Sequence, residues 1–175
     1  RLAADYFVDG SYTATGDSLH LDLRLRDAAT GKEVAAVADD GAPDRVFELA
    51  SSLGARLRYE LRLGDLSRRE ADSVRAALPV NEKAAQLYAE GLDSLRRYEA
   101  AIARARLEKA VAEDPLHALA HSALARAYQA LGYDEKARAS ARKAQDLSLD
   151  LLRGDQLVIE ARYRELIGER DRAIE

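Results

Sequence analysis

The sequence predicts two structural parts, an α+β amino-terminal part with a small antiparallel sheet covered by a helix, followed by an all-α solenoid of helical repeats. Three observations predict this fold class. Apolar and polar residues alternate near the amino terminus, apolar residues recur at helical spacing from Val46 onward, and small residues recur at a fixed interval in the second half. We place the boundary at Pro79, which defines parts 1–79 and 80–175.

The composition excludes several classes of function. The 175 residues, 47% of them hydrophobic, are enough to build a core. Because the 27 Lys and Arg residues are outnumbered by the 31 Asp and Glu residues, no broad cationic surface is available for nucleic acid or anionic lipid. The absence of Cys excludes disulfides and thiolate chemistry. No apolar run approaches the ~20 residues of a membrane span, so we expect a soluble fragment without direct membrane contact.

Three strands are predicted at the amino terminus. Residues 5–15 are rich in aromatic and β-branched side chains and end at a turn containing Gly16. In residues 18–27, leucines alternate strictly with polar residues, which predicts one buried face and one solvated face. Residues 32–39 form a weaker third strand after a turn at Gly31. Three strands alone are marginally stable, so a cover is required.

A helix that runs from Val46 to Leu61 is expected to supply this cover. Asp44 is its expected N-cap, and Gly64 is the expected glycine beyond its carboxyl end. A second, shorter amphipathic helix is expected to open at Leu66-Ser67 and to end before Pro79. Its expected apolar face consists of Ala71, Val74 and Leu78.

Two repeat units follow in the second part. Gly91 and Ala125 lie 34 residues apart (125 minus 91), and so do Ala103 and Ala137 (137 minus 103). Small residues are needed where the two helices of one unit cross closely. With Pro115 as the helix-ending proline, the spacing is that of a tetratricopeptide repeat. The units are 84–117 and 118–151, with further packing positions at Leu87, Leu107, Ala110, Leu124, Tyr128, Gly132 and Ala144.

A third, partial unit is predicted at 154–175. Leu157, Ala161, Gly168 and Ala173 follow in the same order, but the interval from Ala125 to Ala161 is 36 residues (161 minus 125). This interval indicates two inserted residues around 151–155. The second helix of the unit is cut at the end of the sequence, so we expect more repeats to follow in a longer protein.

Several motifs resemble a known arrangement. The segments V-D-G-S-Y at 8–12, L-H-L-D-L-R-L-R-D at 19–27 and A-T-G-K-E at 29–33 resemble the end of a TolB-amino-terminal-like α/β domain. The segments N-E-K-A-A-Q-L-Y-A-E-G-L at 81–92 and I-E-A-R-Y-R-E-L-I-G-E-R-D-R-A-I-E at 159–175 are similar to the tetratricopeptide repeats that often follow such a domain in bacteria.

This resemblance implies that 1–79 is a truncated TolB-like domain in a larger bacterial signalling protein. Proteins of this layout are commonly membrane-anchored serine/threonine kinases, and less often winged-helix regulators or nucleotide cyclases. The resemblance implies a sensor region on the periplasmic side of the inner membrane, with the cytoplasm as the alternative. The chain lacks a kinase glycine loop and a kinase catalytic loop, so any catalysis belongs to sequence outside it.

No catalytic residue, metal ligand or cofactor is predicted. His117 and His121 have the spacing of two metal ligands on one helix face, and Glu113 or Asp114 could be a third. The favoured interpretation is structural, with His117 at the edge of a loop and His121 packed internally. His20 has no serine in a G-x-S-x-G turn to activate, which argues against a catalytic triad.

The predicted binding site is the concave groove lined by the first helix of each unit. Arginines there could bind a carboxylate, and Tyr88 could act as an aromatic anchor. The expected partner is a protein, a peptide or a second copy in a homodimer. The alternatives are an unused or internally filled groove, a rigid spacer, a periplasmic accessory protein, or a metal- or small-molecule-binding enzyme fragment. The predicted groove residues are Tyr88, Leu92, Arg96, Arg126, Gln129, Arg162 and Glu165.

Overall fold

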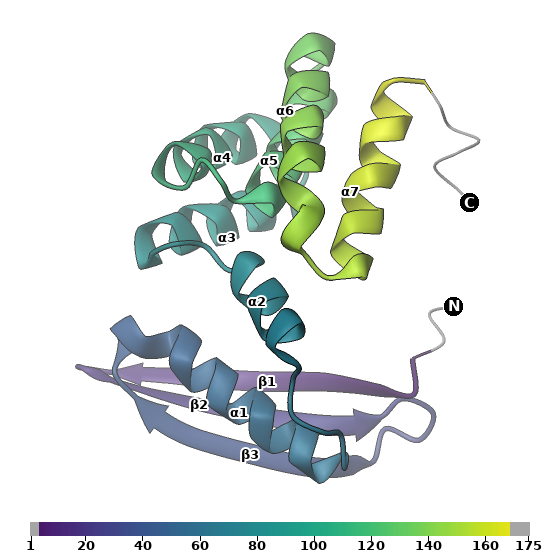
Figure 1. The fold of residues 1–175 in the computed structure, drawn as a ribbon. Coiled ribbons are helices and arrows are strands. Elements are labelled where there is room, and N and C mark those ends of the chain that lie inside the picture. Colours follow the sequence, from purple (N-terminus) through teal and green to yellow (C-terminus); the bar gives the residue numbers. More distant parts are fainter. Residues whose placement is uncertain (1–3, 169–175) are drawn as a thin grey trace. The chain divides into compact units, whose positions relative to one another are not determined.

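The computed structural model describes residues 4–168 and divides the chain into two compact units, Arg1–Leu66 and Ser67–Glu175 (Figure 1). A three-stranded antiparallel sheet with one helix forms the first unit, and helices form the second. This confirms the predicted α+β beginning followed by a helical part. The division falls before the second helix rather than at Pro79, because that helix packs against the helical unit.

The sheet of the first unit has the strand order β1-β2-β3. The strands are β1 (Tyr6–Thr15), β2 (Ser18–Asp27) and β3 (Glu33–Gly41), and both pairs are antiparallel. All three predicted strands are therefore confirmed, β2 with the predicted bounds. Gly16 adopts a φ of +58° in the two-residue turn between β1 and β2, a conformation that glycine adopts without steric cost.

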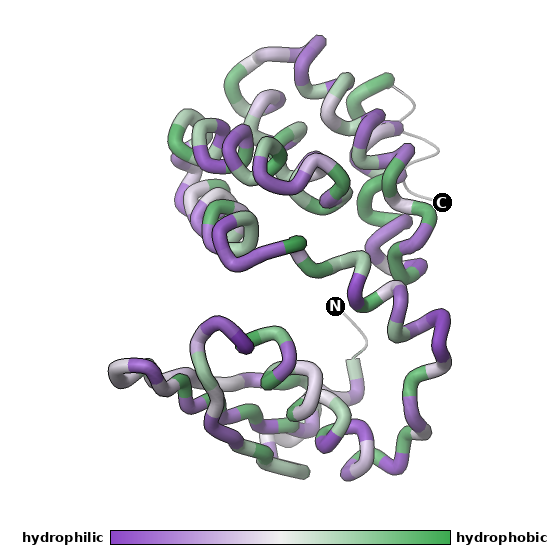
Figure 2. The backbone as a smooth tube through the Cα atoms, turned by 60° about the vertical axis from the view of Figure 1, so that its left-hand side comes forward, coloured by the Kyte–Doolittle hydropathy of each residue, from purple (hydrophilic) through white to green (hydrophobic). Residues whose placement is uncertain are grey.

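The core of the first unit lies between the leucine face of β2 and helix α1 (Val46–Glu60). Figure 1 shows α1 lying across one face of the sheet, where it packs on β3 and β2. Leu53 is completely buried at this interface. Apolar and polar residues alternate along the chain in this unit, as the tube in Figure 2 shows. The core residues are Leu19, Leu25, Val37, Leu49, Leu53 and Leu57.

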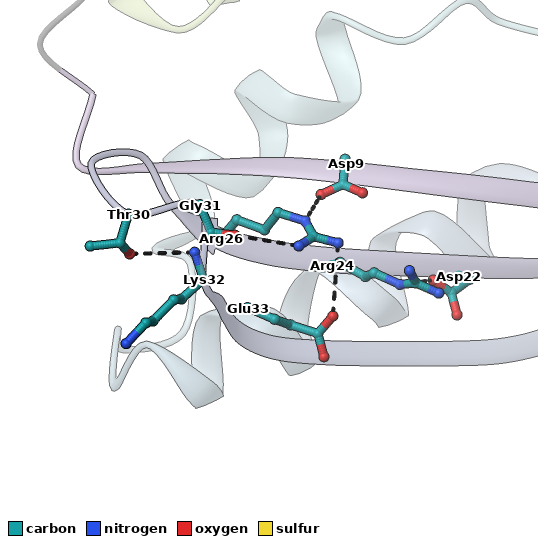
Figure 3. A network of polar contacts seen from close by, with 8 residues as sticks. All are labelled: Asp9, Asp22, Arg24, Arg26, Thr30, Gly31, Lys32 and Glu33. Atoms are coloured by element: carbon teal, nitrogen blue, oxygen red, sulfur yellow. Dashed lines mark hydrogen bonds and ion pairs between the residues drawn. The ribbon is translucent and has the colours of Figure 1, made fainter.

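The opposite face of the sheet is polar, and one arginine links all three strands. Arg26 on β2 donates from Nε to the Asp9 carboxylate on β1 at 2.7 Å. Its Nη2 lies 4.0 Å from the Glu33 carboxylate on β3. Figure 3 shows this guanidinium between the two acidic side chains. The predicted solvated face of β2 is thus held by ion pairs across the sheet.

Helix α1 begins at Val46 as predicted, but the two predicted capping residues are wrong. Asp44 lies inside a 3₁₀ turn, η1 (Pro43–Arg45), because the proline ring already fixes the first turn, and α1 begins without a side-chain cap. Gly64 does not end the helix. Leu61 packs against the core, and the chain turns directly after it at Arg62, whose φ is +55°. The helix is therefore ended by a left-handed arginine instead of a glycine.

Helix α2 (Arg68–Ala76) opens the second unit with a capping box. Ser67 Oγ accepts the Glu70 amide at 3.3 Å, and Glu70 Oε2 accepts the Ser67 amide at 2.8 Å. The Ser-x-x-Glu pattern is a sequence signal for such a start.

The predicted apolar face of α2 is wrong. Val74 and Leu78 are 37% and 39% exposed, whereas Ala76 and Ala77 pack against a cluster that includes Leu151. The small alanine side chains let the end of the short helix approach the unit closely. The amphipathic pattern did not indicate which side would meet a neighbour.

Two helix pairs and one further helix complete the second unit, in which α3 packs against α4 and α5 against α6. A 3₁₀ turn, η2, precedes α7, in the segment where the sequence indicates inserted residues. The second helix predicted for the third repeat unit, with Ala173, lies outside the described residues. None of the described helices is both long and apolar enough to cross a membrane. The bounds are α3 (Glu82–Arg96), α4 (Ala100–Glu113), α5 (Ala118–Ala130), α6 (Asp134–Leu147), η2 (Ser148–Asp150) and α7 (Arg153–Leu166).

Small residues line the contacts within the pairs. A Cβ on Gly91 would lie 2.5 Å from Cγ of Leu107 on α4, which confirms the close approach predicted at this position. Ala125 of the next pair is fully buried. The main cluster of the unit is Leu95, Ala103, Leu107, Ala123, Leu124, Ala127, Tyr128 and Ala137.

A buried carboxylate links α3 and α4 at the end of the pair opposite their connecting turn. Asp114 is 8% exposed, and its Oδ2 accepts the Val80 amide at 2.9 Å, just before α3. Its Oδ1 accepts the Leu116 amide at 3.3 Å, in the turn between α4 and α5. The start of α3 is therefore tied to the end of α4, and the desolvated carboxylate keeps its hydrogen-bond partners.

The turns after α3 and α5 have the same form but different residues. Tyr98 follows α3 with a φ of +62°, and Gly132 follows α5 with a φ of +74°. In both turns the amide of the next residue donates to a helix carbonyl at 2.9 Å, which satisfies an otherwise unpaired group at the helix end. Tyrosine is strained in this left-handed conformation, and glycine is not.

Candidate functional site

The residues predicted to bind a partner lie on α3, α5 and α7. Helix α5 packs against both of the others, so the three helices lie side by side. Four of the predicted side chains, one or two from each helix, are close enough to influence one another electrostatically or through a shared neighbour. These four are Tyr88, Arg126, Arg162 and Glu165.

Tyr88 supplies the aromatic group of the site. The side chain is partly buried on α3, and its ring meets the His117 ring edge-on, with 4.8 Å between centroids and an angle of 80° between the planes. Burial raises the pKa of the Tyr88 hydroxyl, the negative charge of Asp155 raises it further, and Arg162 opposes both. The hydroxyl therefore stays protonated and available as a hydrogen-bond donor near neutral pH.

Arg162 supplies a partly buried cation. Its Nη1 donates to the Ser122 carbonyl at 3.3 Å and also to the Ser122 hydroxyl. Burial lowers the pKa of the Arg162 guanidinium, and the positive charge of Arg126 lowers it too, whereas Glu165 raises it. An arginine stays charged in proteins, so the site holds a positive group that burial and a like-charged neighbour both disfavour.

The remaining three predicted residues lie differently. Leu92 packs against the main cluster of the unit and is only partly accessible. Arg96 and Gln129 are exposed on α3 and α5. The structure thus brings together four of the predicted side chains and places Leu92 in the packing between helices.

Two residues of the site were missed from the sequence. Ser122 lies one helical turn before Arg126 on the same face of α5, so the spacing of the two residues could have indicated it. Asp155 lies in the segment where the repeat spacing is broken, and no repeat position predicts it. We call the complete set the Tyr88–Arg162 cluster, which consists of Tyr88, Ser122, Arg126, Asp155, Arg162 and Glu165.

The two histidines near the cluster, His117 and His121, are hydrogen-bonded to backbone carbonyls. His117 lies at the edge of the loop before α5, as predicted, and is buried, 3% exposed. Its ring reaches 40 residues back to the Ala77 carbonyl, which lies 3.1 Å from Nε2. His121 Nε2 lies 3.0 Å from the Pro115 carbonyl. A carbonyl only accepts, so Nε2 carries the proton in both rings. Burial lowers the pKa of both imidazoles.

The two imidazoles are already committed to hydrogen bonds. Each histidine already uses Nε2 as a hydrogen-bond donor, which leaves only Nδ1 as a possible ligand atom. No group of three or more His, Cys, Asp or Glu side chains suited to a metal ion occurs in residues 4–168. The hydrogen bonds of the two histidines link the start of α5 to the end of α2 and to the turn before α5.

An open hollow beside α2 was not predicted. It measures ≈ 680 Å³ and is bounded by α2 on one side and by η2 on the other. Arg68, Arg69 and Arg75 line it together with Asp72 and Asp150. Cations and anions are thus interleaved around a wide opening, so the hollow has no strong preference for either sign of charge.

The sequence matches no protein-family model and no curated protein. The resemblance to a TolB-like domain followed by tetratricopeptide repeats therefore remains a prediction.

Proposed function

We propose that this chain is a non-catalytic protein-interaction module of a larger bacterial signalling protein. In this proposal the helical unit is an array of tetratricopeptide repeats, and it binds a peptide or protein segment across α3, α5 and α7. One observation carries the proposal. The Tyr88–Arg162 cluster gathers an aromatic hydroxyl and two guanidinium groups from three separate helices.

The arginines of the cluster, which also contains the Asp155 and Glu165 carboxylates, are the groups that could bind a ligand carboxylate. Arg126 is exposed and can present two parallel N–H donors to an acidic side chain or a chain terminus. Arg162 is partly buried, and an anion beside it would offset both the lost hydration and the repulsion from Arg126. Tyr88 offers a rigid ring with a polar end, as aromatic residues do at the centre of many interfaces.

The resemblance described above supplies the context. It favours a sensor region attached to a serine/threonine kinase, on the periplasmic side of the inner membrane. Binding would favour one stacking of the repeats, or one state of association between two chains, over another. The attached domain would respond to that shift in population.

Selection of peptides from a random library on the 175-residue chain tests this function. Peptides that bind are titrated by fluorescence anisotropy against the native chain and two charge-reversal variants. Arg126→Glu should weaken binding at least ~10-fold, because the guanidinium contact is replaced by repulsion. Arg142→Glu on the exposed surface of α6 is the matched control and should leave the affinity unchanged.

Two results would contradict this proposal. One is a library that yields no binding peptide, and the other is equal affinity in both variants. If charge reversal at Arg96, Arg126 and Arg162 together also left signalling by the full-length protein intact, the helical unit would act as a rigid spacer.

A further inference from the structure

The strand β1 is uncovered within its own unit. All ten of its residues are exposed. Helix α1 packs on β3 and β2, so it leaves the same face of β1 bare. The apolar side chains on that face are Val8 and Tyr12, in register with Leu25 and Leu21 of β2, and Tyr6, which lies opposite Asp27. Their exposed fractions are 54%, 75% and 46%. An apolar strip on an edge strand is therefore accessible in residues 4–66.

The free backbone groups of β1 belong to the same residues. The two-residue turn makes Thr15 and Ser18 the closing pair of the hairpin, and such a pair exchanges both N–H···O bonds. Every second residue from Thr15 thus bonds to β2, as does the Asp5 carbonyl, which accepts the Ala28 amide at 2.9 Å. The even-numbered residues from Tyr6 to Ala14 consequently direct N–H and C=O outward.

This edge lacks the usual protection against pairing. Edge strands are commonly blocked by proline, lysine or a bulge, and β1 contains none of these. The irregularity of the sheet lies between β2 and β3. The single charged residue of β1, Asp9, is neutralised by Arg26 at 2.7 Å, as Figure 3 shows.

We propose that β1 pairs with β1 of a second copy of this chain, antiparallel about a twofold axis at Gly10, so that two three-stranded sheets become one. Side chains alternate between the two faces of a strand, so two opposite residues of the paired β1 strands lie on the same face only when their numbers are both even or both odd. The two numbers must therefore sum to an even number. An axis at Gly10 sets Val8 opposite Tyr12 of the second copy and Asp9 opposite Ser11. An axis at Asp9 would set two carboxylates against each other, which is unfavourable.

Gly10 suits the centre of such an interface. The Asp22 carbonyl and a Leu23 methyl lie 2.6 and 2.7 Å from the position that a Cβ would take, so any larger residue would distort the strand. The backbone at the axis therefore carries no side chain. Pairing would satisfy the outward backbone groups and bury Tyr6, Val8 and Tyr12 in one continuous strip. This inference is independent of the function proposed for the helical unit.

Amide hydrogen exchange of the 175-residue chain tests the pairing residue by residue. The amides of Asp9, Ser11 and Thr13 are bonded to β2 and should be protected at every protein concentration. Those of Val8, Gly10 and Tyr12 should become protected only as concentration rises, in parallel with dimer formation in sedimentation equilibrium. A monomer at all concentrations would overturn the proposal, whether its even-numbered amides are open or protected.

A charge at the edge provides the matched variants. Tyr12→Lys should raise the dimer dissociation constant at least ~10-fold, because a lysine would be desolvated beside Val8 of the second copy. Tyr59→Lys on α1, where Tyr59 is 80% exposed, is the control and should not change it. Val8→Lys repeats the test if Tyr12→Lys does not fold by circular dichroism. Dimerisation that survives both edge variants would also overturn the proposal.

Discussion

The two helix pairs of the second unit share a frame but fill it differently. Gly91 faces Leu107 in the α3/α4 pair. The positions 34 residues later (125 minus 91 and 141 minus 107) are Ala125 and Ala141, both buried. One pair combines the smallest residue with a large one, and the other uses two small residues. A fixed helix spacing therefore constrains the combined volume at a crossing more than it constrains either residue.

The largest effect is expected from truncating the large side chain at the contact between α3 and α4. Leu107 is completely buried, so Leu107→Ala should lower the free energy of unfolding by about 2–5 kcal/mol, because the transfer of the side chain and the cavity left behind both contribute. Urea denaturation followed by far-ultraviolet circular dichroism measures this. A loss below ~1 kcal/mol would show that the helices close the gap.

Overfilling the same crossing should cost less. Gly91→Ala adds a methyl group 2.5 Å from Cγ of Leu107 and should destabilise by about 1–3 kcal/mol. The double variant Gly91→Ala/Leu107→Ala has alanine at both positions, as the α5/α6 pair does at Ala125 and Ala141. Its destabilisation should therefore be smaller than the sum of the single changes. Strict additivity in this double-mutant cycle would contradict the idea of shared volume.

A third comparison concerns the turns that end α3 and α5. Tyr98 is left-handed and 95% exposed, so Tyr98→Gly should relieve strain with little loss of contact and stabilise the unit by about 1 kcal/mol. Gly132→Ala at the corresponding place should destabilise by about 1 kcal/mol, because nothing else opposes the added methyl group. Melting temperatures should move in opposite directions. A shift of the same sign in both variants would refute the equivalence of the two turns.

The smallest effect is expected from acidification. His117 corresponds to Leu151 in the next pair (151 minus 117 is 34), and both are buried. Burial lowers the pKa of His117 in the folded state, so the unfolded state binds protons first. Stability should be complete above pH ~6.5, the ordinary histidine pKa, and should fall as the pH drops toward the folded-state value. The loss should be modest, since the bond from Nε2 to Ala77 exists in both protonation states.

Urea midpoints at several pH values measure this dependence. His117→Leu should be less stable at neutral pH, because the Ala77 carbonyl loses its partner, but its stability should depend less on pH. A part of the dependence should remain, since burial also lowers the pKa of His121. An unchanged pH profile in this variant would assign the effect to other groups.

Local patterns in the sequence predicted most of the fold. The alternation of leucines predicted β2 to the residue, and the spacing of small residues predicted the close crossing at Gly91. The caps of α1 were less predictable, because Asp44 lies in the 3₁₀ turn that begins at Pro43 and the chain turns at Arg62 before it reaches Gly64. The prediction of the buried face of α2 failed for a related reason. A sequence pattern shows which side of a helix is apolar, but not which side packs against the rest of the unit.

The candidate site could be predicted only where the repeat frame determines it. Tyr88, Arg126 and Arg162 lie on α3, α5 and α7, which the sequence predicts to be the first helices of successive repeats, so their proximity follows from the packing of those helices. Asp155 lies where the frame is interrupted, and the bond from His117 to Ala77 spans 40 residues of chain. Neither has a local signal, because each depends on how distant segments pack.

The buried carboxylate of Asp114 has a consequence for folding during synthesis. Its partner, the Val80 amide, precedes it by 34 residues, so this amide leaves the ribosome long before the carboxylate that will accept its hydrogen bond. A single emerging helix of this length is only marginally stable in water. The hydrogen bond that ties the start of α3 to the end of α4 can therefore form only after the whole pair has been synthesised, so this bond stabilises the pair and not the single emerging helix.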